Sequence, residues 1–401
     1  MPRVLPIELP PPLRAIFQGI RASGGWALLV GGCVRDALRG EPTHDLDVEV
    51  HGLAATALRE LLSRHGRVNE VGRSFGVFKV KCGNVEVDVA LPRRDSKVGP
   101  GHRGIAAESD PGLDIRQAAR RRDLTMNAIA YDPLEGKVED PFGGVGDIQN
   151  KLMRAVDPTT FGEDPLRALR VAQFAARLRF AVDPELAALC RRAPLGELPP
   201  ERVLGEVEKL LLWGASPAAG WIVAHQLGMW AQVLPAWDRA HPPDLDRLAA
   251  VRLAPEARRL ALLLAGACRD EDELTSVLDR LHLYRWQGVD VRKQATALIR
   301  ARDQVPAESD ADTRARRLAE SVDLEQFAAL VNDPSLRDRA EALGVLNAPL
   351  PALLNGGDGI ALGVPRGPEL GGWLARAREA QLLGKFSDRA GALAWARASA
   401  G

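Results

Sequence analysis

The sequence predicts an α+β protein in which a small domain with a mixed β-sheet precedes a long all-α region. Short apolar or alternating stretches that are typical of strands recur between residues 27 and 90, and helical patterns lie between them. Beyond Arg154 the strand signals largely cease, and helical periodicity continues to the C-terminus. The chain has 401 residues, of which 46% are hydrophobic, so two to four domains with buried cores are expected.

Composition excludes several classes of protein. Lys plus Arg and Asp plus Glu both number 53, so the net charge is zero, which argues against indiscriminate coating of nucleic acid but permits a local basic groove. The four cysteines are scattered, which indicates a reduced, cytoplasmic protein without structural zinc. The N-terminus has no signal-peptide core, and the longest apolar run, Leu260 to Cys268, is too short to span a membrane. No membrane partner is expected.

The first motif begins with a buried strand at residues 27–30, followed by Gly31 and Gly32 and a short helix at residues 33–39. Paired glycines let a backbone turn approach an anionic ligand closely. A helix that starts there points its N–H groups at such a ligand. On its own, however, a Gly-Gly pair is usually only a turn.

Asp45 and Asp47 follow on an alternating stretch, so both carboxylates are expected on one face of a strand, with Leu46 and Val48 toward the core. Two adjacent carboxylates repel each other unless a divalent cation lies between them. An isolated Asp-x-Asp is most often a solvated strand edge or turn. The ordered series of strand, Gly-Gly, helix and Asp-x-Asp is more specific, and it predicts a nucleoside triphosphate with Mg²⁺ on Asp45 and Asp47.

This stretch resembles the first motif of the class II tRNA nucleotidyltransferase and bacterial poly(A) polymerase family. The resemblance implies a polymerase β-like nucleotidyltransferase head at residues 1–154, which is the catalytic domain. It also implies a helical neck at 155–235 for base recognition, a helical body at 236–305 and a helical tail at 306–401 that binds tRNA. Pro/Gly breaks in the helical pattern occur near residues 193–199, 234–243 and 347–358.

The sequence predicts further helices and strands in the rest of the head. Helices are expected at 13–23 and 53–64, and strands at 68–71, 77–81 and 85–90. Asp88 becomes a third catalytic carboxylate if its strand lies beside the strand that carries Asp47, and the alternative is an outward polar residue. In the family that this chain resembles, the corresponding strand carries an acidic residue. Residues 92–117 are rich in Gly, Pro and charge, and resemble the family's flexible loop beside the active site, although a solvated loop without a role is the alternative.

Residues 120–128 resemble the family's second motif, Arg-Arg-Asp-x-Thr-x-Asn-Ala. Arg122 can offer a guanidinium fork to a phosphate, and Asp123 can accept from a ribose hydroxyl. An arginine run by itself is most often a solvated helix face, but the Asp and Asn127 that follow favour the nucleotide site. The glycine-rich turn at 140–147, with a helix expected at 148–152, is interpreted as a hinge rather than a site.

The expected helices of the second half lie at 165–180, 184–192, 200–213, 216–228, 243–268, 270–283, 287–301, 311–331, 335–346, 368–382 and 387–400. The first of them starts with a stretch that resembles the family's fourth motif, Glu-Asp-x-x-Arg. Pro165 makes Asp164 a natural N-cap, but this does not explain Arg167 and Arg170, which share a face one turn on. A carboxylate beside a guanidinium can select cytosine or adenine, because uracil and guanine present a carbonyl where the amino group belongs.

Two departures from the family pattern limit what the resemblance carries over. Gln173 stands where many relatives have an arginine, so one triphosphate contact is absent or supplied elsewhere. No His-Asp dipeptide occurs in the helical half, so a metallohydrolase activity is not expected. Residues 200–206 fit the family's fifth motif and are interpreted as scaffold for the base-reading helix.

The resemblance implies attack of a tRNA 3′-hydroxyl on the α-phosphorus of CTP or ATP, with release of pyrophosphate. Asp45 and Asp47 are expected to hold Mg²⁺, and the nucleotide-binding residues are expected to be Gly31, Gly32, Arg35, Arg122, Asp123, Asn127, Asp164, Arg167 and Arg170. The tRNA end is expected to be bound by its backbone and shape, and no DNA partner is expected. Alternatives are an enzyme that adds only A, a poly(A) polymerase, and a non-catalytic RNA-binding protein. The near balance of acids and bases in residues 341–401 disfavours the polymerase.

Overall fold

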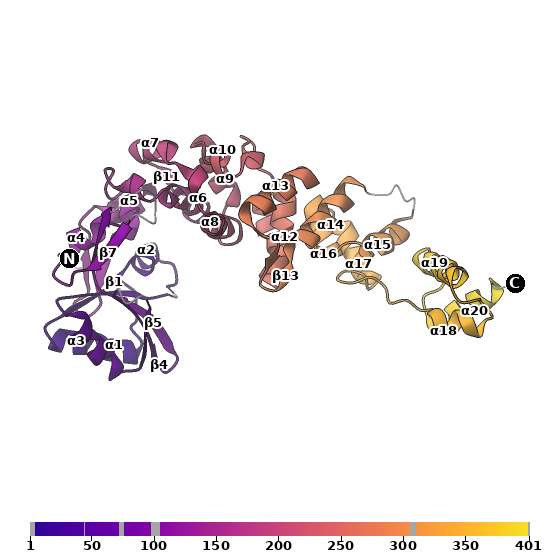
Figure 1. Cartoon of the computed structure of the whole chain (residues 1–401), viewed down its shortest axis with the longest axis horizontal. Helices are drawn as coiled ribbons and strands as arrows, with labels where there is room; N and C mark the ends of the chain where they lie inside the picture. Colours follow the sequence, from indigo (N-terminus) through magenta and orange to yellow (C-terminus); the bar gives the residue numbers. More distant parts are fainter. Residues whose placement is uncertain (1–4, 44, 72–75, 98–104, 305–309, 400–401) are drawn as a thin grey trace. The chain divides into compact units, whose positions relative to one another are not determined.

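The computed structural model describes residues 5–43, 45–71, 76–97, 105–304 and 310–399 (Figure 1). The chain divides into two compact units, one made of residues 1–206 and 219–233 and the other of residues 207–218 and 234–401. The expected head falls within the first unit. The finer division of the chain into head, neck, body and tail stays a prediction. The expected turn at 72–74 and His44 lie outside the described residues.

In the described part of the head, seven strands form one sheet in the order β3-β4-β5-β2-β1-β8-β9. Their bounds are β1 Trp26–Val30, β2 Asp47–His51, β3 Arg67–Val71, β4 Val77–Cys82, β5 Val85–Ala90, β8 Ala130–Asp132 and β9 Lys137–Glu139. β2 and β5 run parallel, whereas the other neighbouring strands pair antiparallel. The mixed sheet that the sequence predicts is confirmed.

Helices cover this sheet. The head helices are α1 Pro11–Ala22, α2 Gly32–Leu38, α3 Ala55–Ser63, α4 Ile115–Arg120 and α5 Gly144–Gln149. α1 contacts α3 and β1 (Figure 1) and buries Leu13, Ile16, Phe17 and Ile20, which recur at the spacing of one helical face. Asp140 accepts hydrogen bonds from the Gly144 and Val145 amides, and α5 therefore starts four residues before the expected helix.

The stretch expected to be structureless, residues 92–117, forms a two-stranded ribbon and a helix. β6, Arg93–Lys97, pairs antiparallel with β7, Ile105–Ser109, and α4 follows. Among the described residues this ribbon pairs with no further strand, so it does not require the apolar alternation by which a half-buried strand is recognised. Residues 98–104 between the strands lie outside the described part of the chain.

Asp132 anchors the head because its fully buried carboxylate receives four hydrogen bonds. The donors are Arg21 Nη2 at 2.6 Å, Trp26 Nε1 at 2.7 Å, and the Leu134 and Glu135 amides at 2.9 and 3.2 Å. These bonds join α1, β1 and the turn after β8. A charge without such partners would be unstable in the interior.

We expect Asp132→Ala to lower the free energy of unfolding by about 3–5 kcal/mol, because it leaves three N–H groups without their acceptor and removes one of the two carboxylates that bind Arg21. Glu135→Ala is the matched control, since Glu135 pairs with the same arginine at an exposed site and should cost under about 1 kcal/mol. Urea-induced unfolding of the head measures both. Equal effects of the two substitutions would contradict this role of Asp132.

The helical part of the first unit surrounds two buried tryptophans. Trp230 donates to the Trp221 carbonyl at 3.1 Å, and the two rings lie 5.4 Å apart. The elements are β10 Leu152–Met153, α6 Leu166–Leu178, β11 Ala181–Val182, α7 Pro184–Arg192, α8 Pro200–Leu212, α9 Pro217–Gln226 and α10 Met229–Val233, of which α8 continues into the second unit. Short 3-10 turns occur in this unit at Thr125–Asn127, Phe161–Glu163 and Leu195–Glu197, and in the second unit at Pro235–Trp237.

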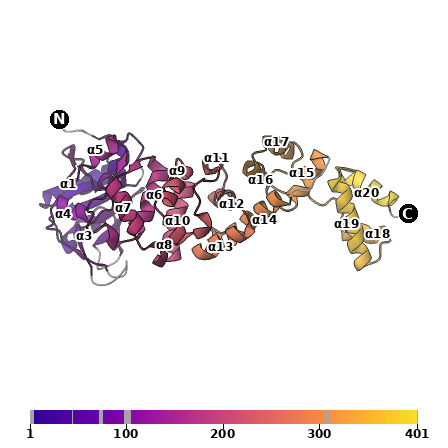
Figure 2. The same ribbon diagram turned by 90° about the horizontal axis from the view of Figure 1, so that it is seen from above.

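The second unit is helical apart from one hairpin, in the residues described. Its remaining elements are α11 Leu245–Ala249, α12 Glu256–Ala267, α13 Glu271–Leu281, β12 Arg285–Trp286, β13 Val289–Asp290, α14 Val291–Asp303, α15 Ala311–Ala319, α16 Leu324–Val331, α17 Pro334–Ala342, α18 Gly356–Ala361, α19 Pro368–Leu382 and α20 Arg389–Ala398. α18, α19 and α20 lie together around a cluster that includes Trp373 and Phe386 (Figures 1 and 2). None of the helices in the described ranges is both long and apolar enough to cross a membrane.

Two expected helices of this unit are each divided in two. The segment 243–268 breaks before Pro255, which cannot donate a backbone hydrogen bond within a helix and stands at the N-cap of α12. The segment 311–331 breaks at Asp323, whose side chain accepts from the Gln326 amide and caps α16. In both cases apolar periodicity resumes on the far side of the break, and it therefore hides the boundary.

Candidate active site

The glycine turn after β1 passes directly beside charged side chains. Gly31 has φ +76° and ψ −129°, a backbone conformation that side-chain-bearing residues rarely adopt. A Cβ atom at this position would lie 3.0 Å from Arg122 Nη1 and 3.9 Å from Asp47 Oδ2. The glycine therefore brings the backbone close to both a guanidinium and a carboxylate.

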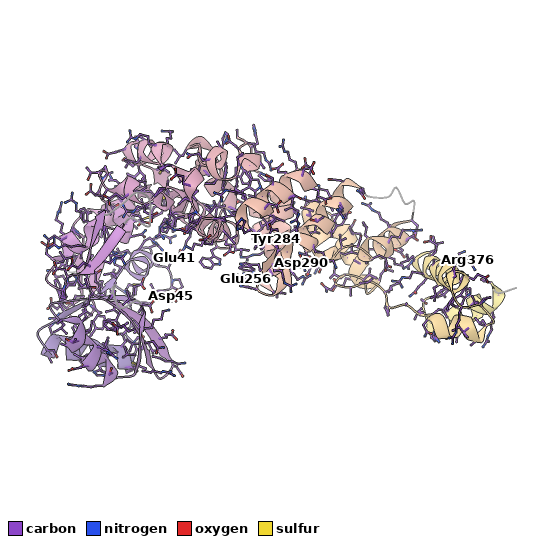
Figure 3. All side chains as sticks on the ribbon, in the orientation of Figure 1. Glu41, Asp45, Glu256, Tyr284, Asp290 and Arg376 are labelled. Carbon is purple, nitrogen blue, oxygen red and sulfur yellow. The ribbon has the colours of Figure 1, made fainter. Side chains whose placement is uncertain are left out.

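The expected acids converge from β2 and β5. Asp47 opens β2 and is the direct register partner of Asp88 on the neighbouring parallel strand, so both side chains lie on the same face of the sheet. Asp45 was expected on the same strand, but it lies on the connection between α2 and β2 (Figure 3). Strand pairing begins only at Asp47, so period-two alternation does not place Asp45.

The charge state of Asp47 reflects this crowding. Partial desolvation raises the pKa of Asp47, the Arg122 guanidinium opposes that shift, and the carboxylates of Asp88 and Asp45 raise the pKa further. Asp88 Oδ1 lies 3.7 Å from Lys79 Nζ. Over the described residues, no group of three His, Cys, Asp or Glu side chains is gathered closely enough to hold a metal ion. The carboxylate oxygens of Asp45, Asp47 and Asp88 are of the kind that Mg²⁺ prefers.

The segment after α4 presents the second motif to this site. Arg122 donates to the Asn127 carbonyl at 3.2 Å. Asp123 accepts from the Asn127 amide group at 3.0 Å and from Arg170 Nε at 2.7 Å. Burial raises the pKa of Asp123, but Arg170, Asn127 and the Leu124 amide outweigh it and hold this pKa below its usual value. Asp123 thus joins the head to α6.

Arg35 lies behind this motif rather than at the surface. Its guanidinium, 3% exposed, donates twice to Asp36, at 2.9 and 2.8 Å, and once to Asn127 Oδ1, at 2.7 Å. The Phe174 ring lies between two arginines, with Arg35 at 5.3 Å and Arg170 at 5.4 Å from its centroid. These contacts position Asn127 and α6, and they leave Arg35 little surface for a ligand.

The start of α6 carries the expected base-reading residues, each with a partner. The N-cap is Pro165, one residue after the expected Asp164, although Asp164 Oδ1 still accepts from the Leu166 amide at 3.2 Å. Asp164 Oδ2 accepts from Arg202 at 2.9 Å. Arg167 donates to the Thr160 and Arg121 carbonyls at 2.9 and 2.7 Å. Asp164 and Arg167 are therefore held by different neighbours, and Gln173 is buried within α6.

Sequence analysis missed Glu49, which is 4% exposed on β2. Its carboxylate lies 3.3 Å from Arg121 Nη2, 3.8 Å from Arg122 Nη2 and 3.3 Å from His51 Nε2. Burial raises the pKa of Glu49, but His51, Arg122 and Arg121 lower it to about 2. A signal for this residue existed, because Glu49 follows Asp47 by two residues in an alternating stretch and so falls on the same face of the strand.

The head thus combines a mixed sheet with neighbouring carboxylates, a close glycine turn and guanidinium groups beside them. Residues 27–154 match the family of the poly A polymerase head domain. The resemblance to the class II tRNA nucleotidyltransferase and bacterial poly(A) polymerase family is thereby confirmed.

Curated relatives extend the likeness beyond the head. The chain is 42% identical over 217 residues to the multifunctional CCA protein of Xanthomonas campestris pv. campestris (strain B100), covering 52% of this chain and 51% of the relative. It is 38% identical over 262 residues to the multifunctional CCA protein of Tolumonas auensis, covering 60% and 62%. The chain thus spans about half to three-fifths of the length of these relatives.

Solved structures share the fold over nearly the whole chain. The crystal structure of Bacillus stearothermophilus CCA-adding enzyme in complex with CTP has a TM-score of 0.75 at 23% identity and covers 98% of each chain. A tRNA nucleotidyltransferase complexed with a primer tRNA and an incoming ATP analog has a TM-score of 0.62 at 23% identity, covering 82% of this chain and 98% of that one. At this identity the likeness establishes the fold, an α+β head followed by helical regions.

Proposed function

We propose that this protein is a template-independent tRNA nucleotidyltransferase that adds C, A or both to the tRNA 3′ end from CTP and ATP, with release of pyrophosphate. The observation that carries the proposal is the convergence of Asp47, the Gly31 turn and Arg122 in a head whose Asp123 is bonded to α6. The curated relatives named as CCA proteins support the choice of reaction. We place the activity in the cytoplasm, where tRNA is processed in bacteria.

Asp45 and Asp47 would hold Mg²⁺, and Asp88 would add charge to the site from the adjacent strand. When bound, the metal activates the attacking hydroxyl and neutralises charge on the leaving pyrophosphate. Gly31 and Gly32 would bring the backbone up to the triphosphate, and Arg122 would donate to it. Asp123 and Asn127 are held by mutual hydrogen bonding for contact with the sugar, and Arg35 orients Asn127 from behind.

Asp164, Arg167 and Arg170 would choose the base. A carboxylate accepts from the amino group of cytosine or adenine, and a guanidinium donates to the adjacent ring nitrogen. Asp164 accepts a hydrogen bond from Arg202, and Arg170 donates one to Asp123. The side chains of Asp164 and Arg170 are therefore oriented before a nucleotide enters. The helical regions would bind the tRNA acceptor end through its backbone and shape.

An enzyme that adds only A is the second candidate, because such an enzyme would keep the same head and base-reading residues. The long connection from Arg94 to Arg121 favours a site that changes shape between cytosine and adenine. It therefore disfavours an enzyme that adds only the two cytidines and no terminal A. Within this connection β6 and β7 pair as an antiparallel ribbon.

We expect the protein to add A to tRNA that ends in CC, given ATP and Mg²⁺. On tRNA that ends before the first C, growth by three nucleotides with CTP and ATP identifies a full CCA enzyme, whereas no growth identifies an A-adding one. Denaturing gels with labelled nucleotides resolve these products. A product that stops at CC despite ATP would contradict the argument from the connection, and extended A tails on unrelated RNA would indicate a poly(A) polymerase. If no nucleotide is transferred to any RNA, the remaining candidate is a non-catalytic RNA-binding protein.

A further inference from the structure

Glu49 occupies a position from which it sets the charge around Asp47. The two residues are two apart on β2, so their side chains leave the same face of the strand about 7 Å apart. Asp47 lies at the open start of the strand, whereas Glu49 is buried. The site therefore has one carboxylate at its surface and a second beneath it.

Both oxygens of the Glu49 carboxylate face side-chain nitrogen atoms. Oε2 faces Arg121 at 3.3 Å and Arg122 at 3.8 Å, and Oε1 faces His51 at 3.3 Å. His51 is fixed in turn, because its Nδ1 lies 2.9 Å from the Leu113 carbonyl oxygen. The side chains of Arg121, Arg122 and His51 thus hold the Glu49 carboxylate in place.

The carboxylates of Asp47 and Glu49 compete for the Arg122 guanidinium. It lies against Gly31 and near Asp47 on one side, and against Glu49 on the other. Coulomb attraction is stronger where solvent is partly excluded, so the half-buried Arg122 would move toward the next anion if Glu49 lost its charge. That anion is Asp47, because Asp47 Oδ2 and Arg122 Nη1 both lie close to Gly31.

We propose that Glu49 is a positioning residue that holds Arg122 off Asp47, so that Asp47 stays open to a divalent cation and Arg122 to the triphosphate. This inference rests on the proposed nucleotidyltransferase site. Arg121 extends the effect, because its carbonyl receives the hydrogen bond from Arg167. One buried carboxylate thereby fixes the second motif against the catalytic strand and against α6.

The test uses the full chain and measures Mn²⁺ binding by electron paramagnetic resonance, without tRNA or nucleotide. Glu49→Gln keeps the shape but removes the charge, and we expect Mn²⁺ affinity to fall about tenfold because Arg122 then covers Asp47. Glu49→Asp keeps the charge and should stay within about threefold of wild type. Glu86→Gln, an exposed change on β5, is the matched control and should leave Mn²⁺ affinity unchanged.

The double variant Glu49→Gln/Arg122→Ala separates this role from a structural one, because it should recover the Mn²⁺ affinity that Glu49→Gln loses. Arg122→Ala alone should stay within about threefold of wild type, which is measurable even if Glu49→Gln does not fold. Unchanged affinity in folded Glu49→Gln, failure of the double variant to recover it, or strong tightening in Arg122→Ala would each overturn the proposal.

Transfer assays give a second measure, because Glu49→Gln should raise the KM for CTP and ATP more than it lowers kcat. Equal losses in kcat and kcat/KM at saturating Mg²⁺ would contradict the positioning role. Since Mn²⁺ binding requires no tRNA, the metal measurements test Glu49 even if the wild-type protein adds no nucleotide. Failure of the proposed function and failure of this inference are therefore distinguishable.

Discussion

Asp47→Ala should reduce nucleotide transfer to tRNA by about 10³-fold or more while leaving the fold intact. The substitution removes a carboxylate that would hold the metal ion, and such an ion supplies several kcal/mol of transition-state stabilisation. Asp47 lies among acids that raise its pKa, so its loss relieves repulsion. We therefore expect the melting temperature to stay the same or to rise slightly.

Asp45→Ala should behave in the same way, and Glu86→Ala on the exposed side of β5 should retain the wild-type rate. Initial rates with labelled ATP on tRNA ending in CC measure all three variants. Chelation of divalent cations should stop the wild-type enzyme, and added Mg²⁺ should restore it. If either aspartate variant kept more than a small fraction of the rate in Mg²⁺, the metal assignment would be wrong.

Asp164→Ala should relax the choice of base, and not merely slow the reaction. Without this carboxylate no acceptor remains to distinguish the amino group of cytosine or adenine from the carbonyl of uracil or guanine. Discrimination that depends on a buried polar mismatch can reach about 10⁴-fold, and much of it should be lost. The ratio of kcat/KM for CTP and ATP to that for UTP and GTP is the quantity to measure.

The competing role of Asp164 is only to cap α6, where its bond to the Leu166 amide is worth about 0.5–2 kcal/mol. Asp183→Ala is the matched control, because Asp183 caps α7 in the same unit by accepting from the Glu185 amide at 3.0 Å. Both variants should lose some stability. If Asp164→Ala melts earlier but keeps the wild-type preference for CTP and ATP, the role of Asp164 is structural, through its bonds to Leu166 and Arg202.

Local patterns in the sequence were sufficient for the outline of the head and for its principal motifs. The strand before Gly31, the strand that begins at Asp47 and the helix that buries Phe17 depend on periodicity and turn chemistry within a few residues. Local patterns were less reliable at element ends. The break before Pro255 and the ribbon at residues 93–109 were missed because neither changes the apolar periodicity on which the prediction depends.

Only the tertiary structure determined which side chains meet. Asp47 faces Asp88 because β5 inserts parallel to β2, and sequence alternation alone left that pairing open. Glu49 and Arg121 are 72 residues apart, and Arg35 and Asn127 are 92 apart, yet each pair shares a hydrogen bond. Such contacts depend on strand order and on helix packing against the completed sheet. The sequence by itself therefore determined the candidate carboxylates and arginines, whereas the fold decided which partners they meet, such as Glu49 for Arg121 and Arg35 for Asn127.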